Sequence, residues 1–368
     1  MNVEYFRQLF PVTQHAIFLN NAAESPLNIR TKSALDDYIR LALHEPFNKE
    51  SPRNAIRERL ARIFGGTASD YALVTSTGVG IGMVAQGFPW QHGDNVVVPA
   101  DEHWNNTFPW IALREKGVEV RFVEPGVDER VTPESVACHV DNHTKIVACA
   151  AVRFTTGFRA DLKRISELAH AHKALFLVDA IQAAGVIPID IDTLGIDIMS
   201  AAAFKWLLGL PGSGFVYINK TARQIISPVL PGMFAAESDF RELRYFPDAR
   251  KYETGTIAYP LFHAWTAGLD LLTEIGIETI HSRIMILTDR IIDGLVAKKL
   301  TVFSPVAQES ERSAIISFSV GDSNTNEQLI ETLSKNRVIV ALRDGRIRVS
   351  PNFYNSEEDI DTFLEMIG

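Results

Sequence analysis

The chain has 368 residues, of which 46% are hydrophobic and 22% charged, a profile typical of a soluble globular protein with one large and one smaller domain. Its formal net charge of −9 argues against nucleic acid or an anionic membrane as the main partner, because both favour a basic protein surface. The two cysteines, Cys138 and Cys149, form no CxxC pair, so we expect a reducing cytoplasm rather than a disulfide scaffold.

Targeting and metal-binding signals are not evident. Residues 1–12 show no basic region followed by an apolar core, so we expect no signal peptide. No segment approaches the ~18 apolar residues of a membrane helix. The ten histidines show no metal-ligand spacing. We therefore expect a cytoplasmic protein without a metal site.

In chain order, a short helix or arm is predicted over residues 1–15, and a brief apolar run then leads into Asn20 and Asn21. These asparagines either cap a backbone turn or face a ligand, and in isolation the proline-bearing segment favours the turn. Apolar residues at helical spacing predict helices over residues 30–45 and 51–64.

A short apolar run over residues 72–74 is followed by Ser76, Thr77 and Gly78, and then by a helix-like stretch over residues 81–88. This order favours an anion site, because free backbone N–H groups and the positive end of a helix dipole meet there. The segment matches neither GxGxxG nor the Walker A pattern, and a plain strand-to-helix turn has a similar sequence. Both interpretations remain open.

Further apolar runs predict strands that alternate with helical segments at the spacing of βα units. These strands cover residues 95–98, 118–124, 144–154, 174–178, 196–203 and 214–219. The sequence therefore predicts an α/β fold with a mostly parallel central sheet. Ligands bind at the carboxyl ends of strands in such sheets. His103, Asp179 and Lys205 each follow a predicted strand, as does the Ser76–Thr77 loop, which predicts one shared site.

After residue 219 the pattern changes. Residues 228–250 are loop-rich, and residues 252–260 form a glycine- and threonine-rich turn. Helices are then predicted over residues 261–274, 277–297, 326–336 and 356–366, with short strands between them. We place a domain boundary near residue 250. The large domain spans 16–250, and a small α+β domain spans 251–368 and includes the arm 1–15.

Motifs spread over nearly the whole chain resemble the class V aminotransferase family, a group of pyridoxal-phosphate (PLP) enzymes of fold type I that includes cysteine desulfurases. The motifs are DEHWNN (101–106), DAIQ (179–182), DIMSAAAFKWLLGLPGSGF (197–215), YETGT (252–256) and RVSPNFYNSEEDID (348–361). The resemblance implies the PLP-dependent transferase fold, PLP as the cofactor and a homodimer.

The resemblance also implies catalytic roles. Lys205 would form the Schiff base with the cofactor aldehyde and would then move the Cα proton of the substrate. Asp179 would pair with the pyridinium nitrogen, so that the ring acts as an electron sink. His103 would stack on the ring and shuttle protons, and Gln182 would hydrogen-bond the ring hydroxyl.

Anion-binding roles follow from the same resemblance. Ser76, Thr77 and Gly78 would cradle the cofactor phosphate, and Thr256 would reach the phosphate of the partner subunit. Arg348 would grip the substrate carboxylate through a bidentate fork. The asparagines at positions 20 and 21 are further candidates for substrate contact.

Several positions depart from the family pattern. Phe204 precedes the lysine where His, Gln or Arg is usual, and Ala202 stands where a serine often binds phosphate. Ala151 replaces an asparagine that holds the ring hydroxyl, and Gly78 replaces a second threonine. We therefore predict that PLP affinity is weak for the family.

No cysteine follows Cys149, whereas a desulfurase needs a mobile nucleophilic cysteine in its C-terminal third. We therefore predict an aminotransferase that acts on a small amino acid. The alternatives are a cysteine or cystine C–S lyase, another β-eliminating or epimerising PLP enzyme, and a PLP-fold binding protein without catalysis.

Overall fold

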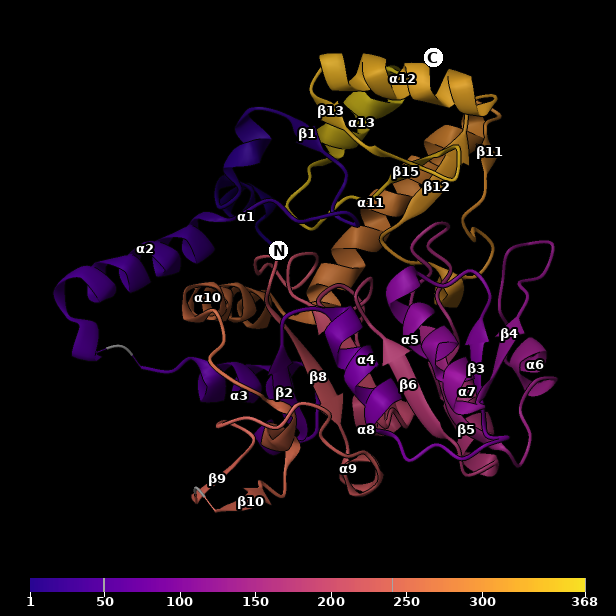
Figure 1. The fold of residues 1–368 in the computed structure, drawn as a ribbon. Helices are drawn as coiled ribbons and strands as arrows, with labels where there is room; N and C mark the ends of the chain where they lie inside the picture. Colours follow the sequence, from indigo (N-terminus) through magenta and orange to yellow (C-terminus); the bar gives the residue numbers. More distant parts are fainter. Residues whose placement is uncertain (49, 240, 368) are drawn as a thin grey trace.

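The computed structural model describes residues 1–48, 50–239 and 241–367. A seven-stranded sheet forms the centre of the larger part of the molecule (Figure 1), in the order β2-β8-β7-β6-β5-β3-β4. The strands are β2 (Tyr71–Val74), β3 (Asn95–Pro99), β4 (Glu119–Val123), β5 (Thr144–Ala150), β6 (Leu175–Asp179), β7 (Ile198–Ala202) and β8 (Gly214–Ile218). Strand β8 runs antiparallel to β2 and β7, and the remaining pairs of neighbouring strands are parallel. The prediction of a mostly parallel central sheet is confirmed.

Helices cover both faces of this sheet, and its strands are therefore apolar on both sides. In β6, Phe176 and Val178 belong to one hydrophobic core, whereas Leu175 and Leu177 belong to another. This two-sided burial explains the continuous apolar runs in the sequence. The helices here are α3 (Arg53–Phe64), α4 (Thr77–Gly87), α5 (Phe108–Ile111), α6 (Pro133–Ala137), α7 (Leu162–Ala171), α8 (Ile191–Leu194), α9 (Lys220–Ile225) and α10 (Tyr259–Ile275).

A second, antiparallel sheet lies above the first in Figure 1, in the order β11-β12-β15-β14. Its elements are β11 (Thr301–Val302), β12 (Ile316–Ser319), β14 (Ala341–Arg343), β15 (Arg346–Val349), α11 (Ile277–Ala297), α12 (Ser323–Lys335) and α13 (Glu357–Glu365). A third core, which includes Leu287, Phe318 and Ile347, holds them together. The division of the chain near residue 250 stays a prediction.

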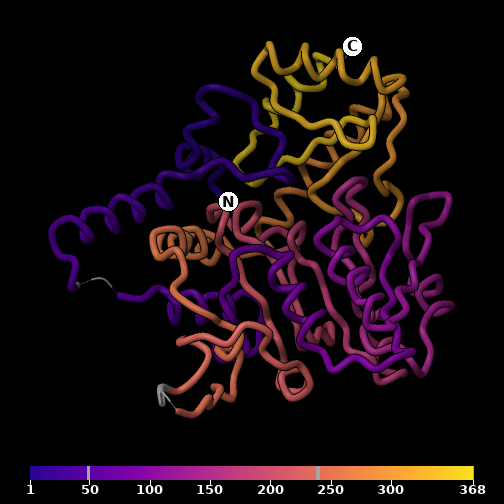
Figure 2. Tube along the Cα trace, viewed as in Figure 1, coloured from indigo at the N-terminus to yellow at the C-terminus, as the bar shows by residue number. Residues whose placement is uncertain are grey.

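The N-terminal segment packs against the C-terminal part of the chain. Helix α1 (Val3–Gln8) places Phe6 against Phe353, and Arg7 pairs with Asp359 at 2.6 Å. Strand β1 (Ile17–Phe18) pairs in parallel with β13 (Val338–Ile339). Helix α2 (Ile29–His44) then projects from the body of the molecule (Figures 1 and 2).

The segment predicted as loop-rich, residues 228–250, contains a β-hairpin. Its strands are β9 (Ala236–Asp239) and β10 (Glu242–Tyr245). The prediction is wrong here because β10 is mostly exposed, so no apolar alternation marks it in the sequence. Short 3-10 helices complete the fold at Pro11–Gln14, Pro46–Asn48, Ala68–Asp70, Trp104–Asn106 (η4), Ala112–Lys116, Ala249–Tyr252 and Glu309–Glu311.

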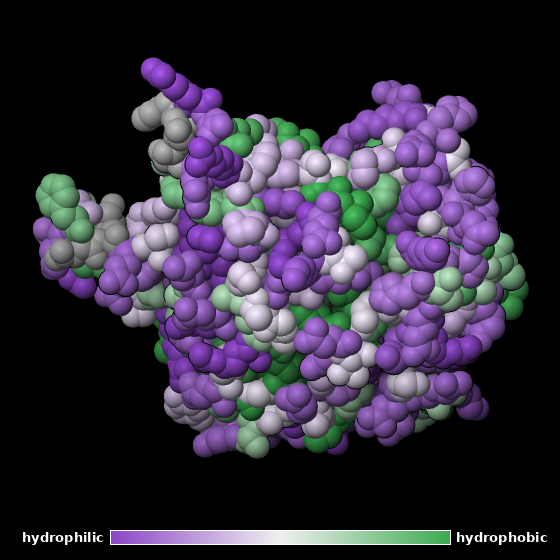
Figure 3. Space-filling model, turned by 90° about the horizontal axis from the view of Figure 1, so that it is seen from below, coloured by the Kyte–Doolittle hydropathy of each residue, from purple (hydrophilic) through white to green (hydrophobic). Residues whose placement is uncertain are grey.

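The surface is largely hydrophilic on the face seen from below, with hydrophobic residues gathered in a central band (Figure 3). Within residues 1–48, 50–239 and 241–367, no helix is both long and apolar enough to cross a membrane.

Candidate active site

The chain turns at the ends of strands β2, β6 and β7 and brings polar groups to one cavity. Asp179 is the last residue of β6, Lys205 follows the end of β7, and Ser76 caps helix α4 just after β2. They share a cavity of about 90 Å³. Its lining consists of Ser76, Thr77, His103, Asn105, Phe154, Asp179, Ile181, Gln182, Ala202, Phe204 and Lys205.

Asp179 is a buried carboxylate in this cavity, and it forms no ion pair with the described residues. One of its oxygens accepts the backbone N–H of Ile181 at 3.0 Å. Burial raises its pKa to about 6, although the Ile181 N–H and the charge of Lys205 oppose the rise. Such a carboxylate suits a cationic ring N–H, which would supply the missing counter-charge.

Lys205 lies near Asp179 and carries an amine of unusual acidity. Burial, and then the positive charge of Arg348, lower the pKa of Lys205 to about 8, while Asp179 acts in the opposite direction. Its Nζ lies 5.8 Å from the centre of the Phe204 ring. A part of the amine is therefore neutral near pH 7, as a nucleophile requires.

His103 lies on the loop after β3 and contacts the edge of the Phe154 ring, with a centroid distance of 5.4 Å. Its Nδ1 accepts the backbone N–H of Asn105 at 3.2 Å, so the ring proton belongs on Nε2. Burial, and then the charges of Lys205 and Arg343, lower the pKa of His103. The imidazole is therefore neutral at pH 7.

Gln182 lines the cavity, but the protein uses both ends of its amide. Its Nε2 donates to the Ala22 carbonyl at 3.0 Å, and its Oε1 accepts the Trp206 indole N–H at 2.9 Å. One amide N–H is left for a ligand. The predicted contact with a ring hydroxyl thus depends on that single donor.

Asn20 and Asn21, both predicted as candidates for substrate contact, differ in their hydrogen bonding. The Asn21 amide donates to the Ser350 carbonyl at 2.9 Å, and its oxygen accepts the Tyr354 hydroxyl at 2.8 Å. These contacts occupy the buried Asn21 side chain and favour the structural role. Asn20 has a buried Oδ1 without a hydrogen-bond partner among the described residues. Of the pair, Asn20 is the better candidate for a ligand contact.

Arg348 is buried beside the cavity. Its Nη1 donates to the Phe154 carbonyl at 2.7 Å, whereas its Nε and Nη2 are buried without a partner in the described part of the chain. Burial, and then the charge of Arg343, lower the pKa of Arg348 to about 10. Because unsatisfied buried donors are rare in folded proteins, these N–H groups suit an anionic ligand.

Arg343 was not expected from the sequence. It is exposed on β14, and its charge lowers the pKa values of His103, Lys205 and Arg348. The hairpin of β14 and β15 places it near Arg348, which is a tertiary relation that no spacing rule marks.

The other end of the cavity carries neutral groups. Ser76 caps helix α4 by accepting the Val79 N–H at 3.2 Å, and the Thr77 Oγ1 accepts the Ala202 N–H at 2.9 Å. Both hydroxyls keep a proton to donate, and the first turn of α4 offers backbone N–H groups. Asn105, which the sequence did not single out, lies here too. This donor set suits a phosphate.

Thr256, which was predicted to contact the phosphate, lies outside the lining of this cavity, and so does Arg153. Thr256 is exposed and does not line the cavity in the single chain; its neighbour Gly255 accepts a hydrogen bond from Arg53 Nη2 at 2.6 Å. Arg153 pairs with Asp101 and donates to the Glu129 carbonyl at 2.6 Å. Its guanidinium is therefore part of an ion-pair network.

Glu102 is a second carboxyl close to the site that the sequence did not reveal. Its Oε1 accepts the Ala150 N–H at 2.5 Å. Burial raises its pKa to about 8, and the nearby charge of Asp179 acts in the same direction. Glu102 is therefore largely protonated at pH 7, which leaves Asp179 as the anionic group of the cavity.

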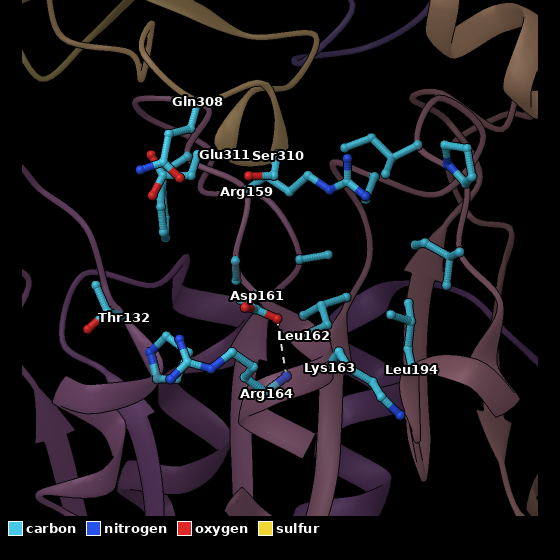
Figure 4. Close-up of a pocket in the computed structure, with 18 of the residues that line it drawn as sticks. Thr132, Arg159, Asp161, Leu162, Lys163, Arg164, Leu194, Gln308, Ser310 and Glu311 are labelled. Atoms are coloured by element: carbon cyan, nitrogen blue, oxygen red, sulfur yellow. Dashed lines mark hydrogen bonds between the residues drawn. The ribbon is translucent and has the colours of Figure 1, made fainter. Parts of the chain in front are cut away.

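A larger cavity, of about 410 Å³, lies beside helix α7 (Figure 4) and shares no lining residue with the Lys205 cavity. Two of its acidic side chains already have partners in the protein. Asp161 accepts the Arg164 backbone N–H at 3.1 Å (Figure 4), and Glu311 pairs with Arg130 at 2.8 Å. None of the predicted site residues lines it. Six of them line the smaller cavity instead: Ser76, Thr77, His103, Asp179, Gln182 and Lys205.

Comparisons with known proteins agree on one family. The model described as Aminotransferase class-V matches residues 18–363. The chain is 29% identical to the "Uncharacterized aminotransferase YcbU" of Bacillus subtilis, over 99% of this chain and 97% of that protein. It is 26% identical to a "Probable cysteine desulfurase" of Methanothermobacter thermautotrophicus, over 100% and 98%. A solved cystine C–S lyase, C-DES, in complex with its product cysteine persulfide, shares the fold with a TM-score of 0.89, 22% identity and coverage of 97% and 98%.

Proposed function

The chain belongs to the class V aminotransferase family of PLP-dependent enzymes, and we propose that it is an aminotransferase that acts on a small amino acid through Lys205. One observation carries the proposal. The Lys205 amine, with a pKa lowered to about 8, shares a cavity with Asp179 and His103. A partly neutral amine beside a buried carboxylate is the pair that PLP chemistry requires.

When bound, PLP supplies an aldehyde for an amine and a ring that withdraws electrons from the substrate Cα. Asp179 would hold the proton on the ring nitrogen, since a carboxylate stabilises the cationic ring. Lys205 would carry the proton between the substrate Cα and the cofactor. His103 would cover one face of the ring and exclude water.

The anion-binding residues divide between cofactor and substrate. Ser76, Thr77 and the first turn of α4 would hold the phosphate by hydrogen bonds from hydroxyl and backbone N–H groups. The unpaired N–H groups of Arg348 would bind the substrate carboxylate, with the free Asn20 oxygen as a further polar contact.

A homodimer in the cytoplasm is part of the proposal. Helix α2 and the turn after it expose apolar side chains: Ile39 is 47% exposed, Leu43 71% and Phe47 98%. An apolar projection of this kind suits burial against a second copy of the chain. Thr256 would then reach the partner's phosphate. Light scattering on the purified protein measures the oligomeric state directly.

The alternative is a cystine or cysteine C–S lyase. The sequence favours it over a desulfurase because no cysteine follows Cys149. A lyase would need the same Lys205 and Arg348 but no keto-acid acceptor. It breaks the Cβ–S bond, expels sulfide from cysteine or cysteine persulfide from cystine, and releases the remaining carbon skeleton as pyruvate and ammonia after hydrolysis.

The test uses purified protein supplied with PLP. Borohydride reduction followed by peptide mapping should place the pyridoxyl group on Lys205. An amino-acid panel with a keto-acid acceptor then distinguishes the reactions. Transfer of the amino group to the acceptor supports the aminotransferase, whereas pyruvate and ammonia from cystine without an acceptor support the lyase. Protein that takes up no PLP would overturn both.

A further inference from the structure

The first turn of helix α4 contains a gap that another loop fills. A Cβ built at Gly78 would lie 3.0 Å from Asn105 Oδ1 and 3.1 Å from Asn105 Cγ. The backbone of Gly78 does not have the positive φ that would itself require glycine. What glycine provides here is therefore space, and the Asn105 side chain occupies it.

Asn105 reaches this place from η4, the short helix after β3. Its backbone N–H donates to His103 Nδ1 at 3.2 Å, and this contact fixes the loop. Its side chain lines the same cavity as Ser76, Thr77 and Lys205. Within the described residues, the carboxamide forms no hydrogen bond with the protein. A polar group with free donors thus lies beside the helix end that offers N–H groups to an anion.

Apart from Ser76 and Thr77, this end of the cavity has few side-chain hydrogen-bond donors. Ala202 and Phe204 line the cavity without a hydrogen-bonding side chain. An amide can turn so that Nδ2 faces a ligand, and Nδ2 carries two donors. We propose that the Asn105 carboxamide binds the PLP phosphate from the space beside Gly78, and that Gly78 is required because it leaves that space open. This inference rests on the proposed use of PLP.

The test compares PLP with pyridoxal, which lacks the phosphate. Both are titrated into cofactor-free protein, and the dissociation constant is followed by absorbance. Asn105→Ala should weaken PLP binding about tenfold, the effect of one hydrogen bond to a charged group, and leave pyridoxal binding unchanged. Asn105→Asp should weaken PLP binding further, since the carboxylate repels the phosphate. Equal losses for both compounds would overturn the proposal, because they would indicate a disturbed His103.

A double-mutant cycle tests the link to Gly78. Gly78→Ala should weaken PLP binding by displacing Asn105, but should have little further effect when combined with Asn105→Ala. Gly82→Ala is the matched control in the same helix, because a Cβ there would meet nothing within 4 Å. Independent, additive losses from Gly78→Ala and Asn105→Ala would contradict the coupling. Thermal melting of each variant shows whether it folds. If the wild type takes up no PLP, the proposed function fails rather than this inference alone.

Discussion

The two ends of the Lys205 cavity are built differently. At one end, Asp179 and Lys205 are buried charges whose pKa values move toward neutrality, to about 6 and about 8. At the other end, Ser76 and Thr77 are neutral and already hydrogen-bonded to the backbone. If the chain acts as proposed, its reactivity would depend on these two buried charges, whereas phosphate binding would be shared among several hydrogen-bond donors.

Removing the charge at the first end should have the largest effect. Asp179→Asn keeps the shape and the hydrogen bond from Ile181 but cannot stabilise a cationic ring. We expect turnover to fall about 10² to 10³-fold, measured with saturating PLP and amino acid.

The stability of the Asp179→Asn variant gives a separate test of the buried charge at position 179. Because burial raises the pKa of Asp179 to about 6, the ionised carboxylate destabilises the cofactor-free protein above that pH. Asp179→Asn should therefore be at least as stable at pH 7, with a gain of up to about 3 kcal/mol in the free energy of unfolding. The gain should shrink as the pH falls from about 6 toward 4 and should vanish below about 4, where the wild-type carboxyl becomes protonated in both the folded and the unfolded state. Loss of stability at pH 7 would contradict this picture.

A change at Arg348, which is proposed to bind the substrate carboxylate, should have the second largest effect. Arg348→Lys keeps the charge but removes the planar fork, so we expect KM for the amino acid to rise about tenfold to hundredfold with a smaller change in kcat. Arg343→Gln is the comparison, because the exposed Arg343 is screened by salt and should change KM less. Equal effects of the two variants would place the substrate carboxylate elsewhere.

The rate of PLP uptake should depend on the protonation of Lys205. With a pKa of about 8, the neutral amine is the minor form at pH 7 and the major form at pH 9. We expect the uptake rate, followed by absorbance after mixing, to rise about tenfold over this range and then level off. A rate that still rises steeply above pH 9 would mean that the site does not lower the pKa of this lysine.

The smallest effect should come from adding a donor at the second end. Ala202→Ser introduces a hydroxyl at a cavity-lining position with little change of volume. We expect the dissociation constant of PLP to fall about fivefold, because the added hydroxyl would gain part of one hydrogen bond to the charged phosphate, with no change for pyridoxal. An unchanged affinity would show that the anchoring end is already complete.

The sequence predicted the fold where burial leaves a periodic pattern. Helix α11 was expected over residues 277–297 and is found there, because its apolar residues repeat at helical spacing. The hairpin of β9 and β10 escaped prediction because β10 is mostly exposed, so no alternation of apolar and polar residues marks it.

The site was predictable in part for a similar reason. Asp179 and Lys205 stand out because each follows an apolar strand. Asn105 and Arg343 did not, since their relevance depends on which loops meet in space. Arg153 shows the same limit: only the structure reveals that Asp101 and Glu129 use its guanidinium.

Helix α1 packs against residues that come much later in the chain. Arg7 pairs with Asp359, 352 positions later in the chain, and Phe6 packs against Phe353. During synthesis, helix α1 therefore remains without these partners until Phe353 and Asp359 have left the ribosome. Contacts between such distant residues also form slowly, because closing a very long loop lowers the conformational entropy of the chain before the contacts can stabilise it. Helix α1 is thus unpartnered in the nascent chain for longer than an element that packs against residues close to it in sequence.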